Sequence, residues 1–169
     1  TGNYMNLKKM TDEELMFRFQ KGKESAYNEI VERYKDKLLN HIFYFVKSRE
    51  LAEDIVQDAL VRVYLNKDKY KDLAKVSTWI YTIAVNLAKT EITKGKRCEK
   101  FSITGKDGDN DYEINDINAS TDEPIMKSEL RKKLLDAIDS LDEKFKEIII
   151  LRDIDGLSYD DIADIMEIP

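Results

Sequence analysis

The chain has 169 residues, a formal net charge of −6, 42% hydrophobic residues and a single cysteine. This length fits one ordinary domain or two small ones, and the hydrophobic fraction is sufficient for packed cores. No apolar run approaches the roughly 18 residues that span a bilayer, and Cys98 alone excludes an internal disulfide framework. Residues 1–5 lack the apolar core of a signal peptide, and we expect the natural start at Met5. The sequence therefore predicts a cytoplasmic protein.

Charge is distributed unevenly along the chain. The net charge is −1 over residues 1–60, +6 over residues 61–100 and −11 over residues 101–169. An acidic protein is a poor candidate for nucleic-acid binding, because phosphate contacts need lysine and arginine. The basic block in the middle of the chain reverses that expectation for this part of the molecule.

The first hundred residues show helical periodicity in four segments. Apolar residues recur at three- and four-residue spacings, while alternation with a period of two is almost absent. Thr11-Asp12-Glu13-Glu14 matches a capping box, so the first helix is expected to begin there. Longer segments follow, and their apolar stripes predict a compact bundle; we place them at residues 26–43, about 51–65 and about 77–93.

The amino-acid composition changes after the fourth segment. Residues 101–123 are rich in Asp, Asn, Gly, Ser and Thr, which is typical of an extended acidic linker. The Asp-x-Asp pattern at 107–111 weakly resembles a calcium loop, but the bidentate glutamate of such a loop is absent. Helical pattern resumes near Pro124, breaks at Gly156 and continues over about 158–166. We predict an all-α chain of two small helical domains joined by an acidic flexible linker.

The third helix carries acidic side chains opposite its apolar stripe. These side chains share their face with one apolar residue, Val61, which lies among Glu53, Asp54, Gln57 and Asp58. One interpretation is an ordinary solvated face on which Arg62 relieves Asp58. The other is a docking face, with Val61 as the buried contact and the carboxylates selecting a basic partner.

The fourth helix has an outer face of the opposite charge. Hydroxyl, amide and cationic side chains gather on it, with one aromatic at its edge; the residues are Trp79, Thr82, Asn86, Lys89 and Thr93, continued by Lys94, Lys96 and Arg97 if the helix persists. Such groups are typical of surfaces that hold phosphates and unstacked bases. The alternative is an ordinary amphipathic helix with Trp79 anchored in the core.

Enzyme chemistry finds little support. The one histidine, His41, lacks the Glu-x-x-His partners of a bundle metal site, so we expect it to be structural or on the surface. Cys98 has no nearby base, and no Walker loop or nucleophile elbow is present. We predict no catalytic residues, no metal, no cofactor and no small-molecule substrate. A helix-turn-helix repressor or a helical adaptor stays open as an alternative.

Four blocks of the sequence together resemble the extracytoplasmic-function (ECF) sigma factors of bacterial RNA polymerase. The similarity covers about residues 11–97 and 125–169, in the order and spacing of that family. The blocks are Leu15-Met16-x-Arg18-Phe19-Gln20-x-Gly22, Ala52-Glu53-Asp54-Ile55-Val56-Gln57-Asp58, Trp79-Ile80-Tyr81-x-Ile83-Ala84-x-Asn86-Leu87-Ala88 and Leu151-Arg152-Asp153-x-x-Gly156-Leu157-Ser158-Tyr159-x-x-Ile162-Ala163.

The resemblance implies a division of the chain into parts. It gives an N-terminal tail (1–10), a sigma domain two (11–97), a linker (98–123) and a sigma domain four (124–169). Domain two would bind core RNA polymerase, recognise the minus-ten promoter element and assist its melting, and an anti-sigma factor is a further partner left open. The implied core-binding residues are Glu53, Asp54, Gln57, Asp58 and Val61. The implied promoter-binding residues are Lys75, Val76, Trp79, Asn86, Lys89, Thr93, Lys94, Lys96 and Arg97.

Two departures from the family pattern affect these expectations. Val76 stands where many relatives have an aromatic residue, and the sequence given stops at Pro169. Helix 158–166 would be the supporting helix of a helix-turn-helix, so we expect this chain not to read a minus-thirty-five element. Its apolar face would stay partly uncovered, which favours a partner, a self-contact or packing of domain four onto domain two; the face consists of Leu157, Ile162, Ala163 and Met166.

Overall fold

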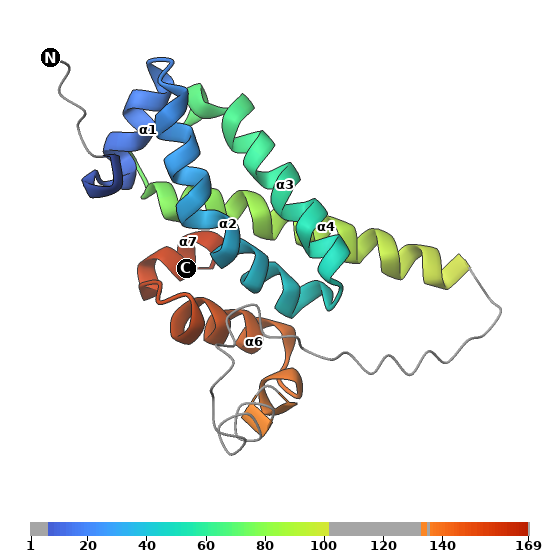
Figure 1. Cartoon of the computed structure of the whole chain (residues 1–169). Coiled ribbons are helices and arrows are strands. Elements are labelled where there is room, and N and C mark those ends of the chain that lie inside the picture. Colours follow the sequence, from blue (N-terminus) through green and yellow to red (C-terminus); the bar gives the residue numbers. More distant parts are fainter. Residues whose placement is uncertain (1–6, 102–132, 135, 169) are drawn as a thin grey trace, which may run out of the picture.

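The computed structural model describes residues 7–101, 133–134 and 136–168, and all regular structure within them is helical (Figure 1). Four helices form an N-terminal bundle: α1 (Asp12–Gln20), α2 (Glu24–Val46), α3 (Arg49–Leu65) and α4 (Val76–Phe101). A C-terminal segment, residues 136–168, lies beside α2 and α4. It contains α6 (Glu143–Ile149), the π-helical turn η3 (Ile150–Ile154) and α7 (Tyr159–Met166). The expected linker from residue 102 onward and the helix start near Pro124 lie outside the described residues.

The ends of the bundle helices follow from local side-chain chemistry. Thr11 Oγ1 accepts a hydrogen bond from the Glu14 N–H at 3.2 Å, and Glu14 Oε2 accepts one from the Thr11 N–H at 2.8 Å. This pair confirms the predicted capping box. Gly22, with φ +84°, then turns the chain into α2, a backbone conformation that residues with a side chain rarely adopt. Ser48 caps α3 by accepting from the Leu51 N–H at 3.3 Å.

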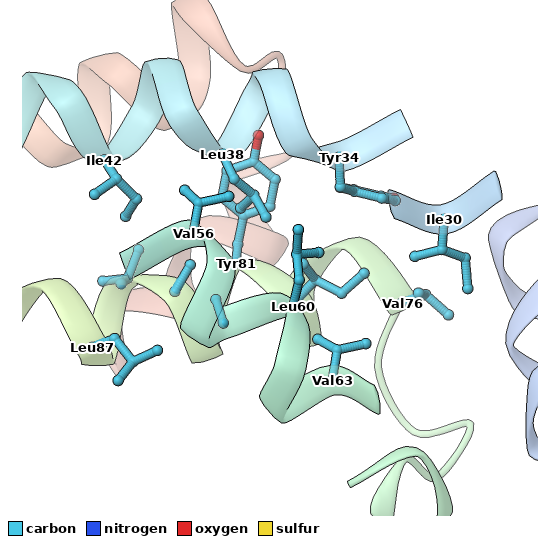
Figure 2. Close-up of a cluster of buried hydrophobic side chains, with 14 of the residues drawn as sticks. Ile30, Tyr34, Leu38, Ile42, Val56, Leu60, Val63, Val76, Tyr81 and Leu87 are labelled. Atoms are coloured by element: carbon cyan, nitrogen blue, oxygen red, sulfur yellow. The ribbon is translucent and has the colours of Figure 1, made fainter. Parts of the chain in front are cut away.

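The core of the bundle is made of the apolar stripes that the periodicity predicts. Figure 2 shows aliphatic side chains of α2 and α3 meeting those of α4, with Leu38 of α2 beside Val56 of α3. Leu38 and Ile42 have no exposed surface, as expected for side chains at the centre of a bundle. The three-helix contact among α2, α3 and α4 therefore fixes which faces of α3 and α4 remain outside.

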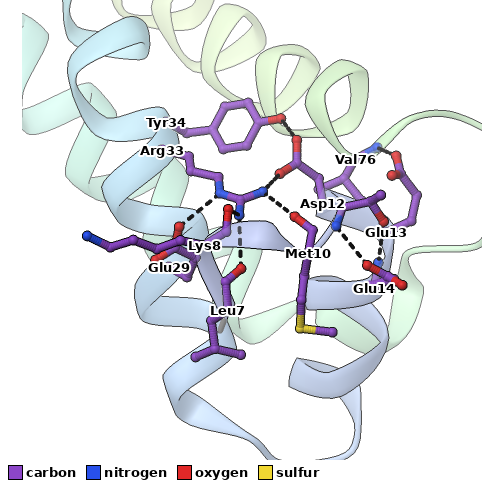
Figure 3. Close-up of polar contacts among 11 residues, drawn as sticks. Leu7, Lys8, Met10, Asp12, Glu13, Glu14, Glu29, Arg33, Tyr34 and Val76 are labelled. Carbon is purple, nitrogen blue, oxygen red and sulfur yellow. Dashed lines mark hydrogen bonds and ion pairs between the residues drawn. The ribbon is translucent and has the colours of Figure 1, made fainter. Parts of the chain in front are cut away.

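Residues 7–10 are packed against the bundle, although the sequence places them in an N-terminal tail. Arg33 of α2 donates to the Met10 carbonyl at 2.9 Å and to the Leu7 carbonyl at 3.0 Å, and it pairs with Asp12 at 2.8 Å (Figure 3). Asp12 also accepts a hydrogen bond from the Tyr34 hydroxyl. These charge-assisted contacts fasten the entry to α1 onto α2. Leu7 and Met10 pack against the core.

The C-terminal segment docks on the bundle instead of standing apart. Leu151 of η3 and Ile162 and Ile165 of α7 belong to the same buried cluster as the bundle side chains. Helix α7 packs against α4. The sequence leaves three possibilities for the apolar face of this segment: a partner, a self-contact or packing onto the N-terminal bundle. In the structure the segment packs onto the bundle.

Helix α4 is longer than its apolar periodicity predicts. The stripe ends near residue 93, but the helix continues to Phe101. The basic residues beyond Thr93 are good helix formers and extend it without needing a buried face. The helix thus passes the expected domain boundary at residue 97.

Candidate functional site

The outer face of α3 presents an acidic surface to solvent. Asp54, Gln57 and Asp58 are exposed, and Val61 among them is 52% exposed. The opposite side of the helix is buried, with Ala52, Ile55 and Ala59 at 3% exposure or less. This α3 surface, which we define as Glu53, Asp54, Gln57, Asp58 and Val61, is the set of residues expected from the sequence.

Ion pairs among the described residues do not account for the charge of the α3 surface. Glu53 is half-buried and pairs with Arg49 at 2.8 Å. In the part of the chain that the structure describes, Asp54 and Asp58 make no ion pair, and Arg62 does not pair with Asp58. Carboxylates at i,i+4 repel each other by a few tenths of a kcal/mol. The α3 surface is therefore available for a basic partner.

The second candidate is the α4 surface. We define it as six of the nine residues that the sequence predicts to bind promoter DNA: Lys75, Trp79, Asn86, Lys89, Thr93 and Lys94. Asn86, Lys89, Thr93 and Lys94 are exposed on α4, and Lys75 is exposed just before it. Lys94 pairs with Glu91 of the same helix at 2.7 Å. The side chains of Lys96 and Arg97 lie outside the described residues, although the helix includes both.

Two residues of the expected α4 set need separate treatment. Trp79 is half-buried against the core, with its ring 5.3 Å from that of Tyr70, so it combines a core role with a partly open edge. Val76 is a correction. Its side chain has no exposed surface, because α4 begins there and turns this position into the bundle. In this conformation Val76 cannot touch nucleic acid, and we remove it from the site.

Two lysines of the α4 surface are paired with the C-terminal segment, which sequence reasoning did not foresee. Lys75 Nζ lies 2.8 Å from Asp161 Oδ2, and Lys89 Nζ lies 3.2 Å from Glu147 Oε1. Thr78 of α4, itself buried, donates to Asp161 Oδ1 at 2.9 Å. These contacts join residues 58 to 86 positions apart in the sequence, and no local pattern predicts them.

The environment of Asp161 shifts its titration. Burial by itself raises the pKa of this carboxyl, but hydrogen bonds from Lys75, Ser158 and Thr78 outweigh burial and hold the pKa below its ordinary value. The same pair raises the pKa of Lys75, through the hydrogen bond to Asp161 and then through its charge. The contact is therefore an ion pair at neutral pH.

A buried polar contact accompanies these ion pairs. His41 of α2 is fully buried, and its Nδ1 lies 2.5 Å from Asp155 Oδ2, whose side chain is 4% exposed. The ring of Tyr81 meets that of His41 edge-on at 5.3 Å. Burial, and next the charge of Asp155, raise the pKa of Tyr81. His41 is therefore a buried contact to the C-terminal segment.

Neither a metal site nor a membrane-spanning helix is found in the part of the chain that the structure describes. No group of three His, Cys, Asp or Glu side chains there is arranged to hold a metal ion. None of the helices there is long and apolar enough to cross a membrane.

Two parts of the chain match known protein families. Residues 30–98 match the family Sigma-70 region 2, and residues 131–169 match Sigma-70, region 4. The chain is 35% identical over 164 residues to the ECF RNA polymerase sigma-E factor of Haemophilus influenzae, covering 95% of this chain and 86% of that protein. It is 34% identical to the ECF RNA polymerase sigma-E factor of Escherichia coli strain K12, covering 95% and 85%.

The chain belongs to the sigma-70 family, among the ECF RNA polymerase sigma factors that act in transcription initiation. The fold agrees with a solved structure of the sigma factor RpoE in complex with the anti-sigma factor NepR from Bartonella quintana. The TM-score is 0.67 at 22% identity, with 85% of this chain and 84% of that chain covered.

Proposed function

We propose that this chain binds core RNA polymerase through the α3 surface and contacts the unpaired strand of the minus-ten promoter element through the α4 surface. It acts in the cytoplasm, where its polymerase partner works, and carries out recognition without catalysis of its own. An anti-sigma factor is a further proposed partner, since the similar protein from Bartonella quintana is solved with one. The proposed domains are residues 11–97 and 124–169, with residues 98–123 as linker, and the family matches at 30–98 and 131–169 support them.

The exposed α3 surface carries this proposal. Packing of the bundle does not require an apolar side chain on the outer face of α3. Val61 is nevertheless apolar, and it is 52% exposed between acidic neighbours. Small apolar contacts surrounded by charge are typical of specific protein interfaces, in which the charges select the partner and the apolar group is buried on binding. A basic surface on polymerase would complement Asp54 and Asp58.

The α4 surface supports the second half of the proposal. Lys89 and Lys94 supply charge for phosphates, and Asn86 offers both a donor and an acceptor to the edge of an unpaired base. The half-buried Trp79 leaves part of an aromatic ring beside them. This combination fits a single strand better than a duplex, because bases expose their faces and edges only after the strands separate.

Charge reversal on α3 tests the first half. We expect Asp54→Lys with Asp58→Lys to weaken binding to core polymerase by at least tenfold, because surface charges facing a basic partner then repel it. Binding is measured by fluorescence anisotropy of labelled protein titrated with core enzyme. Circular dichroism and the melting temperature should stay near wild type, since both side chains are exposed.

The matched control lies on α2. Glu32 and Asp36 are also exposed and four residues apart, so Glu32→Lys with Asp36→Lys makes the same charge change elsewhere. We expect this control to bind core like wild type. Equal core affinity of the two double variants would show that the α3 surface is not the docking site.

A further inference from the structure

Helix α1 holds the loop that leads from α3 into α4. This α3–α4 loop, residues 66–75, includes the 3-10 turn η2 (Lys67–Lys69). The side-chain amide of Gln20, the last residue of α1, donates to the backbone carbonyl of Lys67 at 2.8 Å and to that of Tyr70 at 3.1 Å. An amide nitrogen has two N–H groups, so Gln20 can supply one to each carbonyl. One side chain of α1 thus fixes two points of the loop backbone.

Further contacts join α1 to both ends of the α3–α4 loop. Lys67 Nζ donates in return to the Phe19 carbonyl at 3.4 Å, and it lies 4.8 Å from the centre of the Phe19 ring. At the other end, Glu13 Oε1 accepts a hydrogen bond from the N–H of Val76, the first residue of α4, at 3.4 Å. Glu13 and Gln20 are seven residues apart and share one face of α1. That face therefore holds the loop from its start to the beginning of α4.

The held loop in turn packs against the aromatic residue of the α4 surface. Tyr70 is buried, and its ring centroid lies 5.3 Å from that of Trp79. The Tyr70 hydroxyl donates to the Ala74 carbonyl at 2.7 Å and closes the loop on itself. Lys75, also of the α4 surface, follows directly. A binding site needs its contacting side chains held in place by neighbours, and here the backbone of Tyr70 is held by Gln20.

We propose that Gln20 is a positioning residue for capture of the unpaired promoter strand. Its amide fixes the α3–α4 loop, the loop places Tyr70 against Trp79, and Trp79 then presents its open edge to a base. Gln20 itself is partly buried and its amide is directed at the loop, so it acts without touching DNA. The inference rests on the proposed DNA contact of α4 and adds the residue that orients it. Core binding through the α3 surface should not depend on Gln20.

Removal of the amide tests the role in DNA binding. Gln20→Met in the full chain keeps the length of the side chain and removes its N–H groups. We expect it to bind a single-stranded minus-ten oligonucleotide about fivefold to tenfold more weakly than wild type, as the loss of one or two hydrogen bonds predicts. Affinity is measured by anisotropy against a scrambled oligonucleotide. Asn28→Met, which removes an exposed amide on α2, is the control, and core affinity should be normal in both variants.

An acidic substitution adds a readout that a general loss of stability would not give. In Gln20→Glu an ionised carboxylate faces two carbonyl oxygens and cannot donate to either. Burial and these oxygens favour the protonated form of the new carboxyl group, which raises its pKa, and that form donates an O–H to one carbonyl. The DNA affinity of Gln20→Glu, relative to wild type at the same pH, should therefore recover as the pH falls from 8 towards 5. Asn28→Glu, with an exposed carboxylate, should show no such recovery.

Tryptophan fluorescence reports the same geometry without DNA. Trp79 is the only tryptophan of the chain, so its emission comes from the site itself. We expect acrylamide to quench Trp79 more readily in Gln20→Met than in wild type, because the ring of Tyr70 no longer covers it as closely. In Gln20→Glu the quenching should return towards the wild-type level as the pH falls. Circular dichroism checks that both variants are folded.

The outcomes separate the positioning role from the proposed function. If wild type prefers the minus-ten strand and Gln20→Met binds it equally well, the positioning role is overturned and the function stands. If wild type and the variants all fail to distinguish this strand from the scrambled one, the DNA contact of α4 fails and the positioning role fails with it. Loss of core affinity along with DNA affinity would assign Gln20 to folding alone. Weaker DNA binding with normal core affinity, and its recovery at low pH in Gln20→Glu, supports the proposal.

Discussion

Asp161 has two roles, one through its backbone and one through its carboxylate. Its backbone N–H donates to Ser158 Oγ at 3.2 Å and so completes the cap of α7. Its side-chain oxygens accept hydrogen bonds from Lys75 and Thr78 of the N-terminal bundle. A residue of the first turn of α7 therefore also docks the helix, and its chemistry couples the local structure of α7 to the packing of the two parts.

Titration of Asp161 gives the first residue-scale prediction. Because its pKa in the docked state lies below the ordinary value of 3.8, its contribution to docking is complete at neutral pH and is lost as the pH falls through the lowered value. Lys75→Met should move this pKa up towards its ordinary value, since the largest source of compensation for burial is removed. NMR of the Asp carboxyl carbons over pH 2–6 measures the shift.

A neighbouring lysine provides the control for this titration. Lys71→Met removes an exposed ammonium group in the same loop, and we expect the pKa of Asp161 to stay low in that variant. An unchanged pKa in Lys75→Met would mean that Ser158 and Thr78 alone stabilise the carboxylate, and that Lys75 is not held by it in solution.

Single residues also mark how far the sequence could predict the site. Val61 was identified correctly as exposed, because an apolar residue opposite an apolar stripe must face outward on a helix. Val76 was assigned to the DNA surface by resemblance alone, and burial at the start of α4 removes it. The partners of Lys75 and Lys89 are distant in sequence, and only the packing of α7 and α6 brings them near.

At the scale of elements, the capped and amphipathic helices were the predictable ones. The capping box at Thr11 and the apolar stripe of α3 each follow from fewer than twenty consecutive residues. Helix α4 is longer than expected, because the apolar periodicity that predicts a buried helix ends near residue 93 while the helix continues to Phe101. The docking face of α4 does not follow from the sequence either: Thr78 and Tyr81 interrupt the apolar pattern although both are buried, and Thr78 bonds to Asp161 of a distant segment.

Helix α4 is the element on which the DNA contact depends. We expect Asn86→Ala to lower promoter melting by about fivefold while core binding stays normal, in line with the roughly 1 kcal/mol of one hydrogen bond. The residue is exposed, so its loss should leave the bundle intact. Permanganate reactivity of unpaired thymines in complexes with core polymerase measures melting. Asn28→Ala, which changes another exposed asparagine, on α2, is the control, and identical melting by both variants would count against the α4 surface.

The molecule as a whole places its two proposed surfaces on different sides of the bundle. The inner face of helix α3 packs against α2 and α4, and helix α7 lies against α4 (Figure 1). The α3 surface is consequently open whether or not the C-terminal segment is docked. This arrangement lets a partner bind the α3 surface without first displacing the segment.

Separation of the two parts without unfolding is the prediction at this scale. Ile165 of α7 is 1% exposed and packs in the cluster shared with the bundle. Ile165→Ala removes methylene groups from that seam, and such losses in a core cost about 2–5 kcal/mol. The bundle keeps its own central contacts among Leu38, Ile42 and Val56, so we expect the loss to be confined to the C-terminal segment.

Hydrogen exchange followed by mass spectrometry measures this difference by region. In Ile165→Ala, protection should fall over α6 and α7 and persist in α2 and α3, because weakly held units open independently of a stable core. Ile30→Ala, a comparable loss at a fully buried position of α2, should lower protection through the bundle itself. If Ile165→Ala instead lowered protection equally in α2, α3 and α7, the two parts would unfold as one unit.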